Sequence, residues 1–216
     1  MPKPPIKPVP FPAKPWSKLA IDILGELHGV ANHARYIIVL LDLHSKWPEV
    51  APVANITTQS VTTFLSNMFA RWGIPDEIIS DNGRQFVSKD FDQFCAQVGI
   101  KQRKTALHHP QANGAVERLN RVLKEGIRAF KEEGRTFDDA LRSIISNYRS
   151  TPQCTTGVTP SELMIGRRFK MALDLLALQP HEGMFIFRIL WQTGFPRNNT
   201  STRHMLIRDA EPSSPI

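Results

Sequence analysis

Apolar residues follow two different periods along this 216-residue chain. In the first third they alternate with polar residues or form short continuous runs. The longest run, Tyr36–Leu41 (YIIVLL), is typical of a buried strand and too short to cross a bilayer. From Thr58 onward, apolar residues recur every three to four positions, which is typical of helices with one buried face. The pattern predicts an initial group of strands followed by helices and strands in alternation.

Capping residues and glycines set the limits of the predicted elements. Thr57 or Thr58 can cap a helix that ends at Gly73, and Ser88 can cap another that ends at Gly99. The order of elements predicts an α/β fold with a five-stranded mixed sheet flanked by helices. The predicted strands cover 19–24, 35–42, 47–53, 77–80 and 100–105, and the predicted helices cover 58–72, 89–98, 115–133, 137–149 and a short segment from 160, with a loop at 106–114.

Composition divides the chain into three segments. Residues 1–15 contain seven prolines and no apolar period, which predicts an extended Pro/Lys-rich linker. Residues 16–178 contain all the periodic segments and form the predicted core domain. Residues 179–216 show no clear period and many helix and strand breakers, so we expect a poorly ordered tail.

The chain is basic, with a net charge of +7. Such a balance favours polyanionic partners, above all nucleic acid. The N-terminus has no apolar signal segment, so neither secretion nor a membrane association is expected.

Three acidic residues stand in a strand, at the end of a strand and at the start of a helix. Asp22 lies inside the first apolar strand, Asp81 follows the fourth strand in an Asp-Asn-Gly turn, and Glu117 lies in the predicted first turn of the helix over 115–133. Taken singly, each has an ordinary interpretation: a carboxylate at a solvated strand end, common turn chemistry, or an acid stabilised by a helix dipole.

Taken together, the three acids indicate a site for divalent metal ions. In a sheet of this order the first and fourth strands can be neighbours, and the start of the long helix can close over the cleft between them. Three facing carboxylates repel one another unless cations lie among them. Oxygen ligands at this density suit Mg²⁺ or Mn²⁺. Two such ions, about 3.5–4 Å apart, can activate the attacking oxygen and stabilise the leaving oxygen at a phosphodiester, with no small-molecule cofactor.

Several short sequence blocks resemble those of a known family. In this order they make the chain similar, over about residues 12–178, to the catalytic core of retroviral and LTR-retrotransposon integrases, and to the gypsy class in particular. The blocks are Ile21-Asp22-Ile23, Leu41-Asp42 with Ser45-Lys46-Trp47, Gly73-Ile74-Pro75, Ser80-Asp81-Asn82-Gly83, residues 109–114 (HPQANG) with Glu117-Arg118, and Tyr148-Arg149.

The resemblance implies an RNase H-like fold and an enzyme that trims DNA 3′ ends and joins them to target DNA. It makes Asp22, Asp81 and Glu117 the metal ligands, and 35 residues separate the last two, as in the D,D-35-E signature of the family. Asp42 matches a different block, so we expect it either to be structural or to support the metal ligands from behind. The resemblance further implies a homo-oligomer and DNA contacts through the segment before the long helix, namely Gln111, Asn113 and Gly114. Action in the nucleus is expected from the DNA substrate alone.

The long helix carries a row of cations beside its acid. At about 100° per residue, Glu117 shares one stripe with Arg121, Lys124 and Arg128, which would hold phosphates beside the metal ions. A solvated face with helix ion pairs is an equally good interpretation of Lys124 and Arg128. The same two readings, a phosphate track or a charged sheet edge, apply to the fifth strand. Its basic residues are Lys101, Arg103 and Lys104.

Three functions fit these patterns. The leading hypothesis is an active polynucleotidyl transferase core. The second is a non-catalytic DNA-binding or assembly module, truncated or retained by a host, because neither a zinc-binding His/Cys module nor a β-rich terminal domain is recognisable in the sequence. The third is a metal-dependent nuclease of the same fold, from which strand joining distinguishes an integrase.

Overall fold

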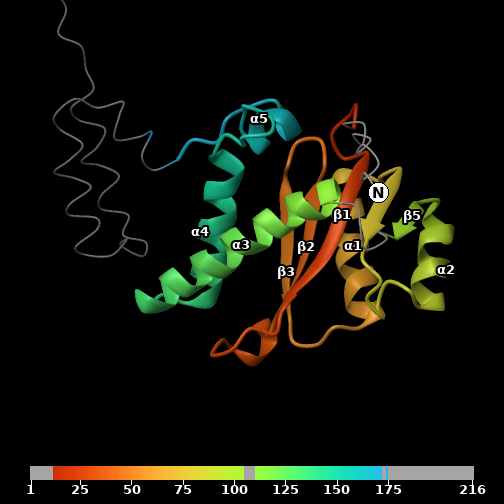
Figure 1. Ribbon diagram of the computed structural model, residues 1–216, viewed down its shortest axis with the longest axis horizontal. Helices are drawn as coiled ribbons and strands as arrows, with labels where there is room; N and C mark the ends of the chain where they lie inside the picture. The colour runs from red at the N-terminus through yellow and green to blue at the C-terminus, as the bar shows by residue number, and fades with distance from the viewer. Residues whose placement is uncertain (1–11, 105–109, 172–173, 175–216) are drawn as a thin grey trace, which may run out of the picture. The chain divides into compact units, whose positions relative to one another are not determined.

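The computed structural model describes residues 12–104, 110–171 and 174, with side chains from 114 onward in the second range. Its five strands form one mixed sheet in the order β3-β2-β1-β4-β5 (Figure 1). The strands are β1 (Lys18–Gly25), β2 (Tyr36–Asp42), β3 (Pro48–Val53), β4 (Glu77–Ser80) and β5 (Lys101–Lys104). The helices are a 3₁₀ turn (Asn32–Ala34), α1 (Thr58–Trp72), α2 (Lys89–Val98), α3 (Pro110–Glu132), α4 (Phe137–Ser150) and α5 (Pro160–Ile165).

The central strand β1 connects the two halves of the sheet. It pairs antiparallel with β2 from Leu19 to Gly25 and parallel with β4, where Ala20 lies opposite Ile79. The predicted meander of the first three strands is confirmed, and so is the neighbourhood of the first and fourth strands. Because β4 ends at Ser80, the residue that follows it comes level with the middle of β1.

Helices cover both faces of the sheet, and each face has its own apolar core. Leu19 and Ile21 of β1 pack on the α1 and α2 side, while Ala20 and Leu24 pack on the α3 and α4 side. This is the alternation expected of a strand buried on both faces. Figure 1 shows α3 and α4 lying together, apart from α1 and α2. The parity of β1 therefore assigns Asp22 to the face that α3 covers.

The predicted helix limits hold for α1 and α2. The Thr57 side chain accepts a hydrogen bond from Ser60 N, and the Ser88 side chain accepts one from Phe91 N. Gly99 ends α2 at φ 74°, a left-handed conformation that glycine adopts without steric cost.

The start of the long helix differs from the prediction. We expected a loop over 106–114 and a helix from Ala115, whereas α3 begins at Pro110. Asn113-Gly114 favours a turn locally, but proline is well suited to a first helical turn, where its missing N–H leaves no hydrogen bond unmade. Gly114 therefore lies inside the helix. The side chains of Gln111 and Asn113 are outside the described residues.

Both edges of the sheet are unsuited to pairing with a further strand. Asp42 N donates to Trp47 O across the β2–β3 turn. The backbone N–H and C=O groups of the odd-numbered residues of β3 therefore point toward β2, and those of residues 48, 50 and 52 point outward. Two of these three are prolines without an N–H, and Arg149 Nη2 occupies the Pro48 carbonyl at 2.8 Å. The other edge, β5, is short and basic. Arg103 pairs there with Glu77 at 2.6 Å, which favours the charged-edge interpretation of this strand.

The domain limits predicted from composition fall largely outside the described residues. The linker over 1–15 is described only from residue 12, and the tail over 179–216 lies outside. Contacts group residues up to Phe169 into one compact unit, which contains the whole sheet. Across the described residues, no helix is both long and apolar enough to cross a membrane.

Candidate active site

The three acids singled out in the sequence line one cavity of about 200 Å³. Asp22 comes from the middle of β1, Asp81 from the turn after β4, and Glu117 from α3. They are 59 and 36 positions apart in sequence (81 − 22 and 117 − 81), and only the parallel pairing of β1 with β4 and the packing of α3 bring them together. The remaining wall is made by Ala20, Ile21, Ile79, Ser80 and Val116.

Asp22 is half-buried in this wall, and both of its carboxylate oxygens accept hydrogen bonds. Ile23 N donates to Oδ1 at 2.8 Å, and Asn120 Nδ2 donates to Oδ2 at 2.7 Å. Burial raises the pKa of the Asp22 carboxyl above its usual value, and the charges of Asp81 and Glu117 raise it further. The two hydrogen bonds act in the opposite direction. The carboxylate is therefore held in place but not neutralised.

Asp81 and Glu117 are exposed at the mouth of the cavity. Asp81 Oδ1 accepts a hydrogen bond from Gly83 N at 2.9 Å, which closes the predicted Asp-Asn-Gly turn. A Cβ at Gly83 would lie 3.0 Å from that Oδ1 and 2.3 Å from Gln85 Nε2, so a side chain there would displace the end of the Gln85 side chain and press on Asp81.

Glu117 does not lie in the first turn of its helix, as was predicted. It follows Pro110 by seven residues, about two turns into α3. The dipole at the helix N-terminus decays within the first turn, so it does not account for an acid at this position. What places Glu117 is the packing of α3, whose adjacent Val116 is buried against the sheet.

Asn120 belongs to this site and was missed in the sequence. It lies one turn after Glu117 on α3, is 9% exposed, and reaches across to Asp22. A polar residue among the buried positions of an otherwise apolar helix face, between Leu119 and Leu123, is the signal that could have identified it.

The donor set of the cavity fits a hard divalent cation, since all three side chains offer carboxylate oxygens. Within the described part of the chain, no three His, Cys, Asp or Glu side chains are close enough together to hold one ion.

The basic stripe on α3 points to solvent. Arg121, Lys124 and Arg128 are all exposed, whereas Leu119, Leu123 and Ile127 of the predicted inward stripe are buried. Among the described residues, none of the three cations has an ion pair within 4.0 Å. Such cations are available to an external anion. The exposure of Lys124 and Arg128 fits both interpretations, a phosphate track and a solvated face, although the helix ion pairs of the second are not formed among the described residues.

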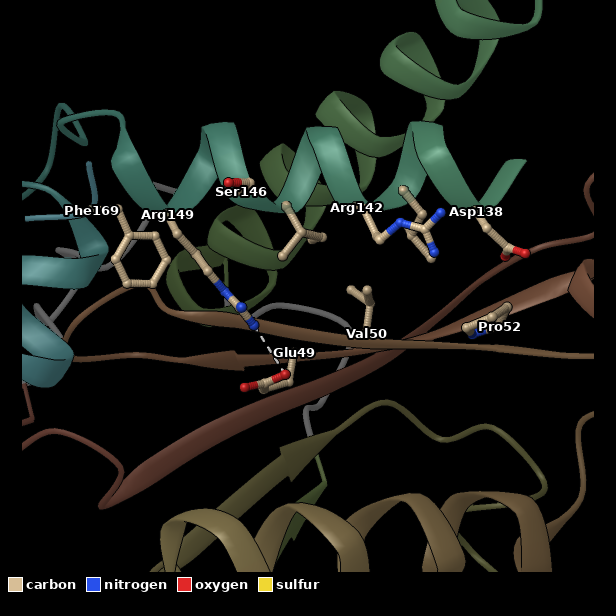
Figure 2. Close-up of a pocket in the computed structure, with 10 residues that line it drawn as sticks. Glu49, Val50, Pro52, Asp138, Arg142, Ser146, Arg149 and Phe169 are labelled. Atoms are coloured by element: carbon tan, nitrogen blue, oxygen red, sulfur yellow. Dashed lines mark ion pairs between the residues drawn. The ribbon is translucent and has the colours of Figure 1, made fainter. Parts of the chain in front are cut away.

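A buried carboxylate, Glu49 of β3, lies beside a groove of about 320 Å³ between β3 and α4 (Figure 2). We call Glu49 and its partners Trp47, Trp72 and Arg149 the Glu49 cluster. Glu49 is 6% exposed and accepts hydrogen bonds at Oε1 from the indole nitrogens of Trp47 and Trp72, at 3.0 and 2.9 Å. Its Oε2 pairs with Arg149 Nη2 at 3.0 Å. The Arg149 guanidinium also lies 4.1 Å from the ring centre of Trp47. This cluster joins β3, α1 and α4.

Asp42 has a structural role, one of the two expected of it. It is fully buried in the β2–β3 turn, where its Oδ2 accepts hydrogen bonds from the backbone and hydroxyl of Ser45 at 2.8 and 2.5 Å. It does not line the cavity of the three acids.

Comparisons with known proteins bear on this site. Residues 12–110 match the model of the integrase core domain family. The chain is 36% identical over 173 residues to the uncharacterized protein K02A2.6 of Caenorhabditis elegans, across 80% of this chain and 13% of that protein. It is 31% identical over 164 residues to the Gag-Pol polyprotein of walleye dermal sarcoma virus, across 74% of this chain and 9% of the polyprotein. The chain thus spans about an eighth or less of these relatives.

Solved structures share its fold. A chain in the simian T-cell lymphotropic virus intasome, in complex with the PP2A regulatory subunit B56 gamma, aligns with a TM-score of 0.66 at 20% identity, over 77% of this chain and 60% of that one. The HTLV-2 integrase catalytic core in complex with magnesium, in its trimeric form, aligns with a TM-score of 0.58 at 20% identity, over 70% of this chain and 98% of that one. Both confirm the predicted fold, which is RNase H-like.

Proposed function

We propose, on the premise that the chain belongs to the integrase core family, that it is a polynucleotidyl transferase which cuts and joins DNA. The observation that carries the proposal is the convergence of Asp22, Asp81 and Glu117 on one cavity from two strands and a helix. Assignment to the gypsy class is part of the same proposal and rests on the sequence blocks alone.

The three carboxylates are the proposed ligands of Mg²⁺ or Mn²⁺, with two ions per site. When bound, the ions supply Lewis-acid chemistry at the attacking and leaving oxygens of the phosphodiester. A relative of the same fold was solved in complex with magnesium, which supports this choice of metal. The residues of the chain itself contribute by holding the ligands in place: Ile23 N and Asn120 hold Asp22, and Gly83 N holds Asp81.

DNA is the proposed substrate, held along the exposed face of α3. Arg121, Lys124 and Arg128 follow Glu117 along that face, so a phosphate backbone bound to them would lead into the cavity. The segment of Gln111, Asn113 and Gly114 precedes Glu117 on the same helix and is proposed to extend this contact. Such backbone contacts position DNA and carry little sequence information.

Joining two DNA ends requires more than one active site, and we propose a homo-oligomer acting in the nucleus. A trimeric form of a core of the same fold supports an assembly of copies. The nuclear location follows from the substrate alone and is tested by following the tagged full chain in cells.

A strand-joining assay tests the function. The full chain would be given Mn²⁺, a target plasmid and a library of DNA ends with recessed 3′-hydroxyls. Wild-type protein and Glu125→Gln, an exposed acid on the same helix, should give joined products, and Glu117→Gln should lose them by roughly a thousandfold, as expected when metal catalysis is removed.

The products separate the three hypotheses. Joined DNA that depends on Glu117 establishes an integrase. Cut DNA without joining identifies a nuclease of the same fold. Salt-sensitive DNA binding with neither product identifies a DNA-binding module and overturns the enzymatic proposal.

A further inference from the structure

One polar side chain of α3 reaches into the strand that carries Asp22. Asn120 is 9% exposed and donates from Nδ2 to Asp22 Oδ2 at 2.7 Å. This bond joins residues 98 positions apart. It therefore links α3 to β1 beside the cavity, in addition to the apolar packing between these two elements.

The same helix carries a second ligand of the cavity. Glu117 precedes Asn120 by three residues, which places both side chains one turn apart. A bond from Asn120 to Asp22 thus sets the position of the Glu117 helix relative to the Asp22 strand. One contact governs the geometry of two of the three proposed metal ligands.

The Asn120 bond also limits how Asp22 can turn. Its Oδ1 is held by Ile23 N at 2.8 Å and its Oδ2 by Asn120. Each carboxylate oxygen has two acceptor sites, so one remains on each oxygen for a cation. With both oxygens anchored, the direction of those remaining sites is fixed before any ion arrives.

Packing alone does not account for an amide at this position. The neighbouring inward residues Val116, Leu119 and Leu123 are apolar, and Asn120 Oδ1 is buried without a hydrogen-bond partner among the described residues. An unpaired buried acceptor is unfavourable. The contribution that offsets it is the bond to Asp22.

We propose that Asn120 is a positioning residue that orients Asp22 for metal binding. The proposal rests on the metal site of the proposed function and deepens it. Hydrogen-bond partners behind metal ligands typically change metal affinity by 10- to 100-fold when they are removed. Asn120→Leu is the sharpest variant, because leucine has the same branched skeleton and cannot donate a hydrogen bond.

The test measures Mn²⁺ binding to the full chain by the loss of the free-ion signal in electron paramagnetic resonance, without DNA and without turnover. We expect Asn120→Leu to bind Mn²⁺ about tenfold more weakly than wild type. The control Asn67→Ala, an exposed asparagine on α1, should bind as wild type does. Thermal unfolding of each variant, with and without Mn²⁺, reports whether it is folded, and Asn120→Ala replaces the leucine variant if that one does not fold.

The outcomes separate two failures. If wild type binds Mn²⁺, Asp22→Asn does not, and both Asn120 variants match wild type, then the metal site stands and the role of Asn120 is wrong. The same conclusion follows if the Asn120 variants lose thermal stability but keep their Mn²⁺ affinity, because Asn120 is then merely structural. If wild type itself does not bind Mn²⁺, the metal site of the proposed function fails.

Discussion

Two carboxylates on strands of the same sheet, Glu49 and Asp22, differ in how their negative charges are compensated. At β3, Glu49 is surrounded by donors: two indoles and the guanidinium of Arg149 satisfy both of its oxygens. At β1, Asp22 faces two further acids and has an amide and a backbone N–H as its donors. The charge of Glu49 is neutralised by a cationic side chain of the fold, whereas the donors that hold Asp22 are uncharged and leave its charge available to a bound cation.

This difference separates a structural carboxylate from a functional one. Both residues lie in apolar surroundings, so burial alone does not distinguish them. The pKa of Asp22 is raised by burial and by like charges, which is the pattern found at sites where a ligand supplies the missing charge. At the Glu49 cluster, burial lowers the pKa of Arg149, and the neighbouring Glu49 charge opposes that shift.

The largest effect on folding is expected at the Glu49 cluster. Arg149→Ala leaves the buried Glu49 charge with only a distant cation, Arg71 at 4.0 Å, and should lower the free energy of unfolding by about 3–5 kcal/mol. Chemical denaturation measures it. Arg142→Ala on the same helix is the matched control, since that residue is exposed and its loss should change stability by less than about 0.5 kcal/mol. Equal effects of the two variants would show that the cluster is not structural.

A smaller effect is expected on DNA affinity from the α3 stripe. Replacing Lys124 and Arg128 by Gln should leave folding unchanged and reduce the slope of log affinity against log salt by about 1 per residue. Fluorescence anisotropy over a salt series measures the slope. Arg71→Gln, on the opposite face of the sheet, should leave it as in wild type, and an unchanged slope in the α3 variant would remove the stripe from the DNA path.

The smallest effect is expected from Asp22 itself, on the stability of the metal-free protein. Because the folded pKa lies above the usual value near 3.9, the folded state binds more protons than the unfolded state between those two values. The free energy of unfolding should therefore rise as pH falls from neutral through the raised pKa of Asp22.

Asp22→Asn should remove that pH dependence and stabilise the protein by about 1 kcal/mol at neutral pH, the usual gain when a strained site is relieved. Denaturation of wild type and variant at several pH values, with a chelator present, measures both. A variant less stable than wild type would place Asp22 with Glu49, among the structural carboxylates.

Local patterns predicted most of the fold and three residues of the site. The order of the elements predicted that the first and fourth strands are neighbours, and the helix caps at Thr57 and Ser88 were readable because a cap acts within a few residues. The predicted start of α3 was wrong because Asn113-Gly114 favours a turn when it is considered locally, and the surrounding helix overrides that preference.

The contacts that were missed join elements distant in sequence. Asn120 reaches Asp22 over 98 positions, and Arg149 reaches Pro48 over 101. No period or spacing specifies which two side chains meet across such intervals, because that depends on how helices settle on the sheet. The polar residue within an apolar stripe is visible in the sequence, but its partner is not.

The prolines on the outer edge of β3 have a consequence for how copies of this chain assemble. An extended strand from another copy would find a single N–H, at Val50, among three outward positions, and a carbonyl that Arg149 already occupies. Copies therefore cannot merge their sheets through the β3 edge. A contact between copies at this edge would have to be made by side chains, and each sheet would keep its own register. The β3 edge is thereby protected against the strand addition that builds fibres.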